Sequence, residues 1–108
     1  MEHDLITRVE QILVREDGTQ VRIVAQEFDG LFRSSVGVDV FRRPHEGANW
    51  TLCSDRPHPD WRTMSVAEYN ARGRCEKFQA ASHGEIFRVS GLVGLTRQQA
   101  RERGAVCV

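Results

Sequence analysis

Residues 21–29, V-R-I-V-A-Q-E-F-D, are the stretch that decides the fold, because an Asp-Gly pair stands on each side of them. Asp-Gly between two apolar runs is a strong hairpin signal, since the tight type I′ turn needs positive φ at both central residues. The pairs Asp17-Gly18 and Asp29-Gly30 therefore predict two consecutive hairpins. Residues 21–29 are then the central strand of an antiparallel sheet.

A two-residue turn also fixes which residues face each other across each hairpin. The two turns predict two apolar rows on one buried face, which are Val14/Val21/Val38 and Ile12/Ile23/Val36. The other face is expected to be mixed and partly wet, and its apolar members are Leu13, Val24, Phe28 and Leu31. An apolar patch of that kind on a small domain indicates a contact surface.

The expected strands form a four-stranded antiparallel β-meander and cover residues 5–15, 20–29, 31–42 and 50–54. Gly37 interrupts the third strand and predicts a bulge or bend there. A Pro-rich loop follows over residues 55–64, because Pro57 and Pro59 bar regular structure. Trp61 in this loop is either an interface anchor or a lid on the open end of the sheet.

Three capping boxes, each a Ser or Thr followed three residues later by Glu or Gln, predict helices beginning after residues 65, 82 and 96. The first has Val66 and Tyr69 on its inner face and ends at Gly73; the second reaches residue 93, and the third residue 103. Alternatively, residues 75–80 and 85–89 form two short strands. The expected class is α+β, a single domain over 1–108 in which the meander (5–54) carries two or three short helices from a helical or mixed tail (65–108) on one face.

Composition indicates one ordinary globular domain, with 108 residues of which 40% are hydrophobic and 28% charged. No apolar run reaches the length of a membrane span, and the acidic start M-E-H-D does not resemble a secretory leader. Three cysteines, an odd number, fit a reducing compartment better than a disulfide framework. We therefore expect a cytoplasmic protein without a membrane partner.

The sequence contains no strong motif for metal binding or for catalysis. Cys53, His58, Cys75 and His83 are zinc-ligand types, but their spacings lack the tight C-x2-C and H-x3-H forms of a strong signal. The sequence contains no G-x-S-x-G, no Gly-rich phosphate loop and no H-E-x-x-H. We therefore expect no metal, no cofactor and no enzyme activity. A small zinc-binding protein or enzyme is the third of three hypotheses for the function, after the two described next.

DNA binding is the second hypothesis. Within residues 84–103, the run V-S-G-L-V-G-L-T-R-Q-Q-A-R resembles a helix-turn-helix in outline. That resemblance implies that Thr96 and Arg97 contact phosphate and that Gln98 and Arg101 face base edges. It covers only about a dozen residues; Gly91 weakens its first helix, and its second is short. The formal net charge of zero also differs from the basic balance of most nucleic-acid-binding domains.

The leading hypothesis is a non-catalytic binding protein: an adaptor, regulator or inhibitor that occludes a partner's surface. The candidate partner-binding residues are apolar or aromatic side chains of the mixed face and loop, with nearby arginines: Phe28, Leu31, Val24, Arg42, Arg43, Trp61 and Arg62. Such arginines favour an acidic surface on the partner protein. A homodimer is the other possibility, in which the same face meets its own copy.

Overall fold

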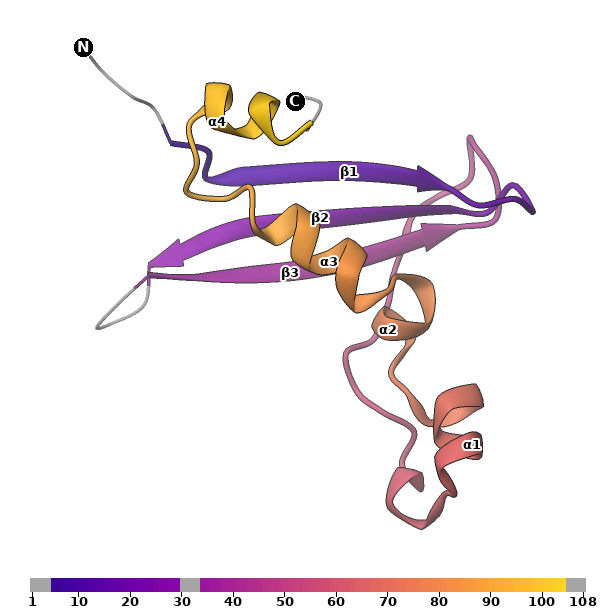
Figure 1. Ribbon diagram of the computed structural model, residues 1–108. Coiled ribbons are helices and arrows are strands. Elements are labelled where there is room, and N and C mark those ends of the chain that lie inside the picture. The colour runs from indigo at the N-terminus through magenta and orange to yellow at the C-terminus, as the bar shows by residue number, and fades with distance from the viewer. Residues whose placement is uncertain (1–4, 30–33, 105–108) are drawn as a thin grey trace.

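The computed structural model describes residues 5–29 and 34–104, which form a four-stranded antiparallel sheet with short helices (Figure 1). The strands are β1 (Arg8–Val14), β2 (Gln20–Asp29), β3 (Ser34–Arg43) and β4 (Thr51–Leu52). Their order in the sheet follows their order in the chain, so each strand pairs with its sequence neighbours. The predicted α+β class and antiparallel meander are confirmed.

The first hairpin turns over three residues instead of two. The backbone N–H of Gly18 donates to the carbonyl of Arg15 at 3.0 Å, and the N–H of Arg15 donates to the carbonyl of Thr19 at 2.8 Å. Gly18 has a φ of +89°. This is a type I turn followed by a glycine in the left-handed conformation. An Asp-Gly pair is compatible with this three-residue turn and equally with the two-residue turn.

The longer turn changes the register between β1 and β2. Leu13 faces Val21, and Gln11 faces Ile23. The predicted partners were each one residue further along β1, and a shift of one residue exchanges the two faces of a strand. The predicted register was therefore wrong: Leu13 lies on the same face as Ile23, whereas Ile12 lies on the opposite face.

The second hairpin also differs from the prediction. Ile23 pairs with Val40, four residues beyond the predicted Val36. Four residues, 30–33, separate β2 from β3 where two were expected, and they lie outside the described residues. Because this shift is even, β3 keeps its predicted faces, and Val36 remains on the side of Ile23.

Two helices cover one face of the sheet, which we call the helix-covered face (Figure 1). Helix α3 (His83–Ser90) contacts β1, β2 and β3, and α2 (Glu76–Ala80) contacts β3. Small and branched side chains fill the space between these helices and the strands, namely Val9, Val21, Ile23, Ala25, Val40, Cys53, Ala81, Ile86 and Val89. Ile23 is fully buried, which confirms its predicted place in the core.

The second and third predicted capping boxes are present. The hydroxyl of Ser82 accepts from the backbone N–H of Glu85 at 3.1 Å, and the Glu85 carboxylate accepts from the N–H of Ser82 at 2.9 Å. Thr96 and Gln99 form the same arrangement at the start of α4 (Arg97–Glu102). Because α2 and α3 occupy residues 76–90, the alternative pair of strands there is excluded, and α3 ends three residues before the predicted 93.

Helix α4 lies beside the N-terminal end of β1 (Figure 1). The N–H of Ile6 donates to the carbonyl of Leu95, and the N–H of Gly94 donates to the carbonyl of Ile6, both at 2.7 Å. The segment between α3 and α4 thus provides a short partner for the outer edge of the chain just before β1. Along β1 itself, from residue 8 to 14, the described residues contain no further strand on that edge.

Residues 55–74 form an arm that projects away from the sheet (Figure 1). The arm contains a 3₁₀ turn η1 (Trp61–Thr63), a single turn α1 (Val66–Glu68) and a π-helical turn η2 (Tyr69–Gly73). Ser65 caps α1 as predicted, because its hydroxyl accepts from the N–H of Glu68 at 3.2 Å. Val66, however, is exposed, so the expectation that it faces inward was wrong.

A small aromatic cluster holds the arm together. The ring of Trp61 packs on that of Tyr69 with their centroids 6.1 Å apart, so Trp61 is not a lid on the sheet. A Cβ on Gly73 would lie 2.8 Å from both Met64 Sδ and Tyr69 Cδ2, and the φ of Gly73 is not positive. The helical turns end at Gly73 as predicted, and Gly73 is needed there for close packing, without a left-handed conformation.

The arm makes the molecule elongated. The radius of gyration is 16.0 Å, compared with about 13 Å for a compact domain of this length. At the base of the arm, the N–H of Lys77 donates to the carbonyl of Ser54 at 3.1 Å, so the chain returns to the point that it left. Within the described residues, no helix has the length and apolar character needed to cross a membrane.

Candidate protein-binding surface

The second face of the sheet carries the candidate site, and we call it the uncovered face because α2 and α3 pack on the other side. Side chains alternate between the two faces of a strand. The uncovered face thus takes even-numbered residues from β1 and β2 and odd-numbered residues from β3. Four of its apolar side chains are largely exposed, namely Ile12 (49%), Val14 (67%), Phe28 (53%) and Leu52 (56%).

Phe28 lies flat on the sheet in a slot provided by Gly37. A Cβ on Gly37 would overlap the ring of Phe28, coming within 2.7 Å of its Cζ atom. The ladder is continuous through this position, with Gly37 paired to Gln26, so the predicted bulge is absent. The missing side chain lets one face of the ring rest on the backbone and leaves the ring more than half exposed.

A layer of arginine and aromatic side chains covers the other end of this face. The guanidinium carbon of Arg22 lies 4.4 Å from the ring centroid of Phe41 and 5.2 Å from that of Trp50. The guanidinium carbon of Arg43 lies 4.1 Å from the Trp50 ring. Arg43 also donates two hydrogen bonds to the side-chain oxygen of Gln20, at 2.9 and 2.7 Å. These cation–π contacts and hydrogen bonds fix the positions of the side chains.

An ion-pair network borders the apolar side chains. Glu10 accepts from Arg8 at 3.0 Å and lies 3.5 Å from the Nε atom of Arg22. The Nε atom of Arg22 is buried and has no hydrogen bond of good geometry, so we regard its contact with Glu10 as electrostatic. The uncovered face therefore combines exposed apolar groups with a charged border, as contact surfaces do.

The predicted partner-binding residues do not form one surface. Phe28 and Val24 lie on the uncovered face, but Val24 is buried beneath its neighbours. Arg43 is on the same face and is engaged with Trp50. Leu31 lies outside the described residues.

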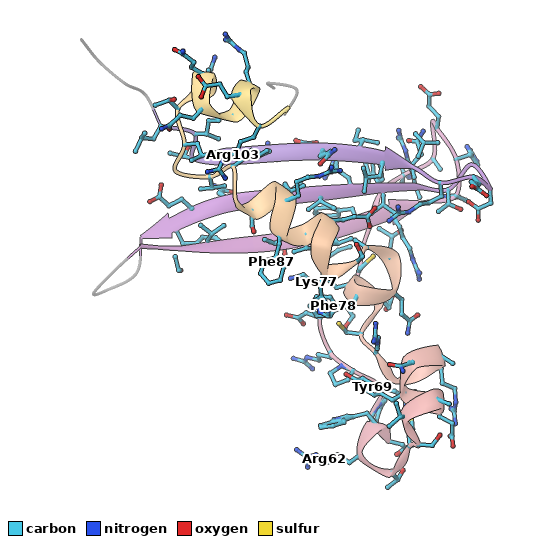
Figure 2. The ribbon with its side chains drawn as sticks, in the orientation of Figure 1. Arg62, Tyr69, Lys77, Phe78, Phe87 and Arg103 are labelled. Carbon is cyan, nitrogen blue, oxygen red and sulfur yellow. The ribbon has the colours of Figure 1, made fainter. Side chains whose placement is uncertain are left out.

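The other three predicted residues lie elsewhere. Arg42 belongs to the helix-covered side, where it donates to Glu76 of α2 at 3.0 Å. Trp61 and Arg62 are in the arm, with the Arg62 guanidinium carbon 5.3 Å from the Trp61 ring. Figure 2 shows Arg62 at the far end of the arm, away from the strands.

Sequence reasoning missed three of the four exposed apolar residues on this face. Ile12 and Val14 were assigned to the buried face because the first turn was taken to have two residues. A three-residue turn with Gly18 left-handed would have exchanged the faces of β1 and identified both. Leu52 had no local signal, since its placement depends on its pairing with Phe41.

The segment that resembles a helix-turn-helix does contain two successive helices. Thr96 caps α4 and accepts from Gln99 at 3.1 Å. Arg97, Gln98 and Arg101 are exposed on this helix, which spans six residues. On α3, the apolar side is occupied by its packing on the sheet.

The cysteine and histidine side chains lie in different environments. Cys53 and Cys75 are buried free thiols, and burial raises the pKa of the Cys53 thiol. The backbone N–H of His58 bonds within the arm, whereas the ring of His83 packs against Phe78 with centroids 4.3 Å apart. Among the described residues, no group of three or more His, Cys, Asp or Glu side chains is placed to hold a metal ion.

Comparison with known proteins found no matching family model, no similar curated protein and no similar solved structure. Inference about function therefore rests on the side chains of this molecule.

Proposed function

We propose that this chain is a small non-catalytic protein that acts by protein–protein interaction, as an adaptor, regulator or inhibitor that occludes a partner's surface. The observation that carries this proposal is the uncovered face, on which Ile12, Val14, Phe28 and Leu52 each expose an apolar side chain. Burying a large apolar side chain against a partner contributes about 1.5–3 kcal/mol. Leaving several of them in water on a small domain favours a contact surface.

The order already present on this face supports the proposal. Phe28 rests on Gly37, and Trp50 contacts both Arg22 and Arg43, so these side chains lose little freedom when a partner binds. Aromatic residues and arginine are also the types that most often dominate binding energy. The arginines of the face favour an acidic surface on the partner protein.

A matched pair of substitutions tests this function. Phe28→Asp places a charge on the uncovered face, and Val66→Asp places the same charge on the arm, where Val66 is exposed and away from the sheet. Wild type and both variants are immobilised, and the bound proteins from the source organism are identified by mass spectrometry. Wild type and Val66→Asp should retain the same partner, and Phe28→Asp should lose it.

Folding and self-association serve as controls. Circular dichroism and thermal melting must show that both variants remain folded. A dimer in solution that dissociates in Phe28→Asp would identify a second copy as the partner. Retention of the same proteins by all three chains would contradict the proposed surface.

DNA binding is a second candidate, supported by the two capped helices α3 and α4 and by the exposure of Gln98 and Arg101. Under this alternative, affinity for duplex DNA falls steeply with salt, and replacing Arg97 and Arg101 by Ala reduces that dependence. A gel mobility-shift assay at low salt decides the matter, because absence of any shift eliminates this candidate.

A further inference from the structure

The outer edge of β1 presents a row of backbone groups that the sheet does not use. The carbonyl of Thr7 accepts from the N–H of Glu27 at 2.9 Å, and the N–H of Arg15 donates to the carbonyl of Thr19 at 2.8 Å. These two pairs lie at the two ends of the β1–β2 ladder. Since hydrogen-bonded positions alternate along an antiparallel strand, the odd-numbered residues of β1 bond to β2.

The even-numbered residues therefore point their N–H and C=O groups outward, and in β1 these are Arg8, Glu10, Ile12 and Val14. Ile6, the preceding even-numbered residue, already uses both of its outward groups with Leu95 and Gly94. This edge therefore already makes strand-like hydrogen bonds just before β1. No strand among the described residues pairs with the outward-pointing groups of β1 itself.

A groove of about 510 Å³ runs along this edge, between β1, the C-terminal part of α3 and the end of α4. Gln11 and Ile12 line it on the strand side, Arg88 and Leu92 on the helix side, and Arg103 at the end. Figure 2 shows Arg103 between α4 and α3, next to β1.

The charges around the groove are unbalanced. Arg88 and Arg103 are exposed, and the described carboxylates form no ion pair with either of them. Glu10 also lines the groove, but its carboxylate is engaged with Arg8 and Arg22. Arg15, on the same side of the sheet, is by contrast paired with Glu85 at 2.8 Å. On the other side of the edge, the uncovered face presents the exposed side chain of Ile12. The helix-covered side of the edge is thus cationic, and the uncovered side exposes Ile12 and Val14 beyond the charged pair of Arg8 and Glu10.

We propose that the outer edge of β1 binds an extended segment of a partner protein as a fifth strand of the sheet. Side chains alternate along a strand, so the segment places acidic residues toward Arg88 and Arg103 and apolar residues beside Ile12 and Val14. Backbone hydrogen bonds to the even-numbered residues of β1 supply affinity, and this alternation supplies specificity. The inference rests on the proposed protein-binding function and names the kind of partner.

The first test uses a peptide of alternating Glu and Val, as long as the seven residues of β1, with a fluorescent label. Fluorescence anisotropy should show binding to wild type, and the same peptide with Lys in place of Glu should bind at least about tenfold more weakly. Replacing both Arg88 and Arg103 by Ala should weaken binding of the Glu peptide by about tenfold. Equal binding of the Glu and Lys peptides would overturn the proposal.

The second test addresses the backbone. Ile12→Pro removes an N–H that points outward, so the β1–β2 ladder should survive and peptide binding should be lost. Ile12→Ala keeps this N–H and should weaken binding only a few-fold. In case Ile12→Pro does not fold, two Glu-Val peptides are titrated into wild type, each with one of the two sets of alternate amides N-methylated. The peptide whose methylated amides face β1 should not bind. Unchanged affinity of the N-methylated peptides, with either set of alternate amides blocked, would overturn the proposal.

Partner capture then separates failure of this inference from failure of the proposed function. Suppose that a partner binds wild type and a folded Ile12→Pro variant but not Phe28→Asp. The uncovered face then binds the partner, and the edge of β1 does not. Loss of the partner with both variants supports both. A wild-type dimer that becomes monomeric in Ile12→Pro assigns the edge to a second copy and overturns the peptide proposal.

Discussion

Glu85 links the N-terminal cap of α3 to Arg15 at the end of β1, and replacing it by Gln should make the protein less stable in a pH-dependent way. Its two carboxylate oxygens each accept from Arg15, at 2.8 Å, and one of them also accepts from the N–H of Ser82. Arg15 donates in addition to the carbonyl of Ala80 at 2.8 Å. The hydrogen bonds from Arg15, followed in importance by those of Ser82, lower the pKa of Glu85 from 4.5 to about 2.

The size of the effect follows from this shift in pKa. Taken at full strength, lowering the pKa from 4.5 to about 2 corresponds to about 3 kcal/mol. The side chains of Arg15 and Glu85 are 35% and 26% exposed, so solvent screening reduces the contribution, and we expect about 1–2 kcal/mol. A carboxylate whose pKa is lower in the folded state stabilises fully above its unfolded pKa. The contribution is therefore complete above about pH 5 and is lost as the pH falls toward 2.

Urea unfolding of wild type and Glu85→Gln, between pH 7 and pH 2.5, measures this contribution. Glutamine can keep the capping hydrogen bond, so the substitution mainly removes the charge. The difference in unfolding free energy should be about 1–2 kcal/mol at pH 7 and should shrink toward zero at pH 2.5. The matched control is Glu68→Gln, since exposed Glu68 pairs with Arg72 only within the arm at 3.2 Å and should change stability little. Parallel pH profiles for wild type and Glu85→Gln would refute the reasoning.

Three further outcomes test the packing. Ile23→Ala should lower the unfolding free energy by about 2–5 kcal/mol, because Ile23 is fully buried; an unchanged urea midpoint would remove it from the core. Gly37→Ala should displace the ring of Phe28 and cost about 1–3 kcal/mol, seen as altered Phe28 ring signals by NMR; unaltered signals would contradict the slot. Native protein at pH 8 should react slowly with a thiol reagent at Cys53 and Cys75, and rapidly after unfolding; immediate reaction of both would show that they are not buried.

The parts of the fold that depend on neighbouring residues could be predicted from the sequence. Ser82 with Glu85, and Thr96 with Gln99, mark helix starts because each cap is closed within four residues of chain. The apolar runs on each side of Asp17-Gly18 likewise identify two strands that must pair. These signals require no knowledge of the rest of the molecule.

The register could not be predicted, because Gly18 allows two turns of different length. Both turns place a glycine at positive φ, and only the three-residue form packs Leu13 against the core and exposes Ile12. The choice depends on which side chains fit beneath α3, and that helix lies about 70 residues further along the chain.

The candidate site was harder still to predict, since its contacts join distant residues. Trp50, just before β4, contacts Arg22 of β2. The ring of Phe28 occupies the space left by the absent side chain of Gly37, where the sequence suggested a bulge or bend. Arg42 and Arg43 are adjacent in the chain, yet they serve opposite faces of the sheet. Their roles follow from the alternation of the strand and become visible only once the register is known.

The arm, about a fifth of the chain, leaves the sheet and returns to it at neighbouring residues. Its presence therefore does not affect the topology of the sheet and its helices. Ser54 and Lys77 already touch through a backbone hydrogen bond of 3.1 Å, so a short Gly-Ser link in place of residues 55–74 would join points that are neighbours. Shortening such a loop several-fold lowers its closure entropy by about 1 kcal/mol. The same site would tolerate an inserted domain or reporter. The arm is thus the place where this protein can gain or lose length without rebuilding its core.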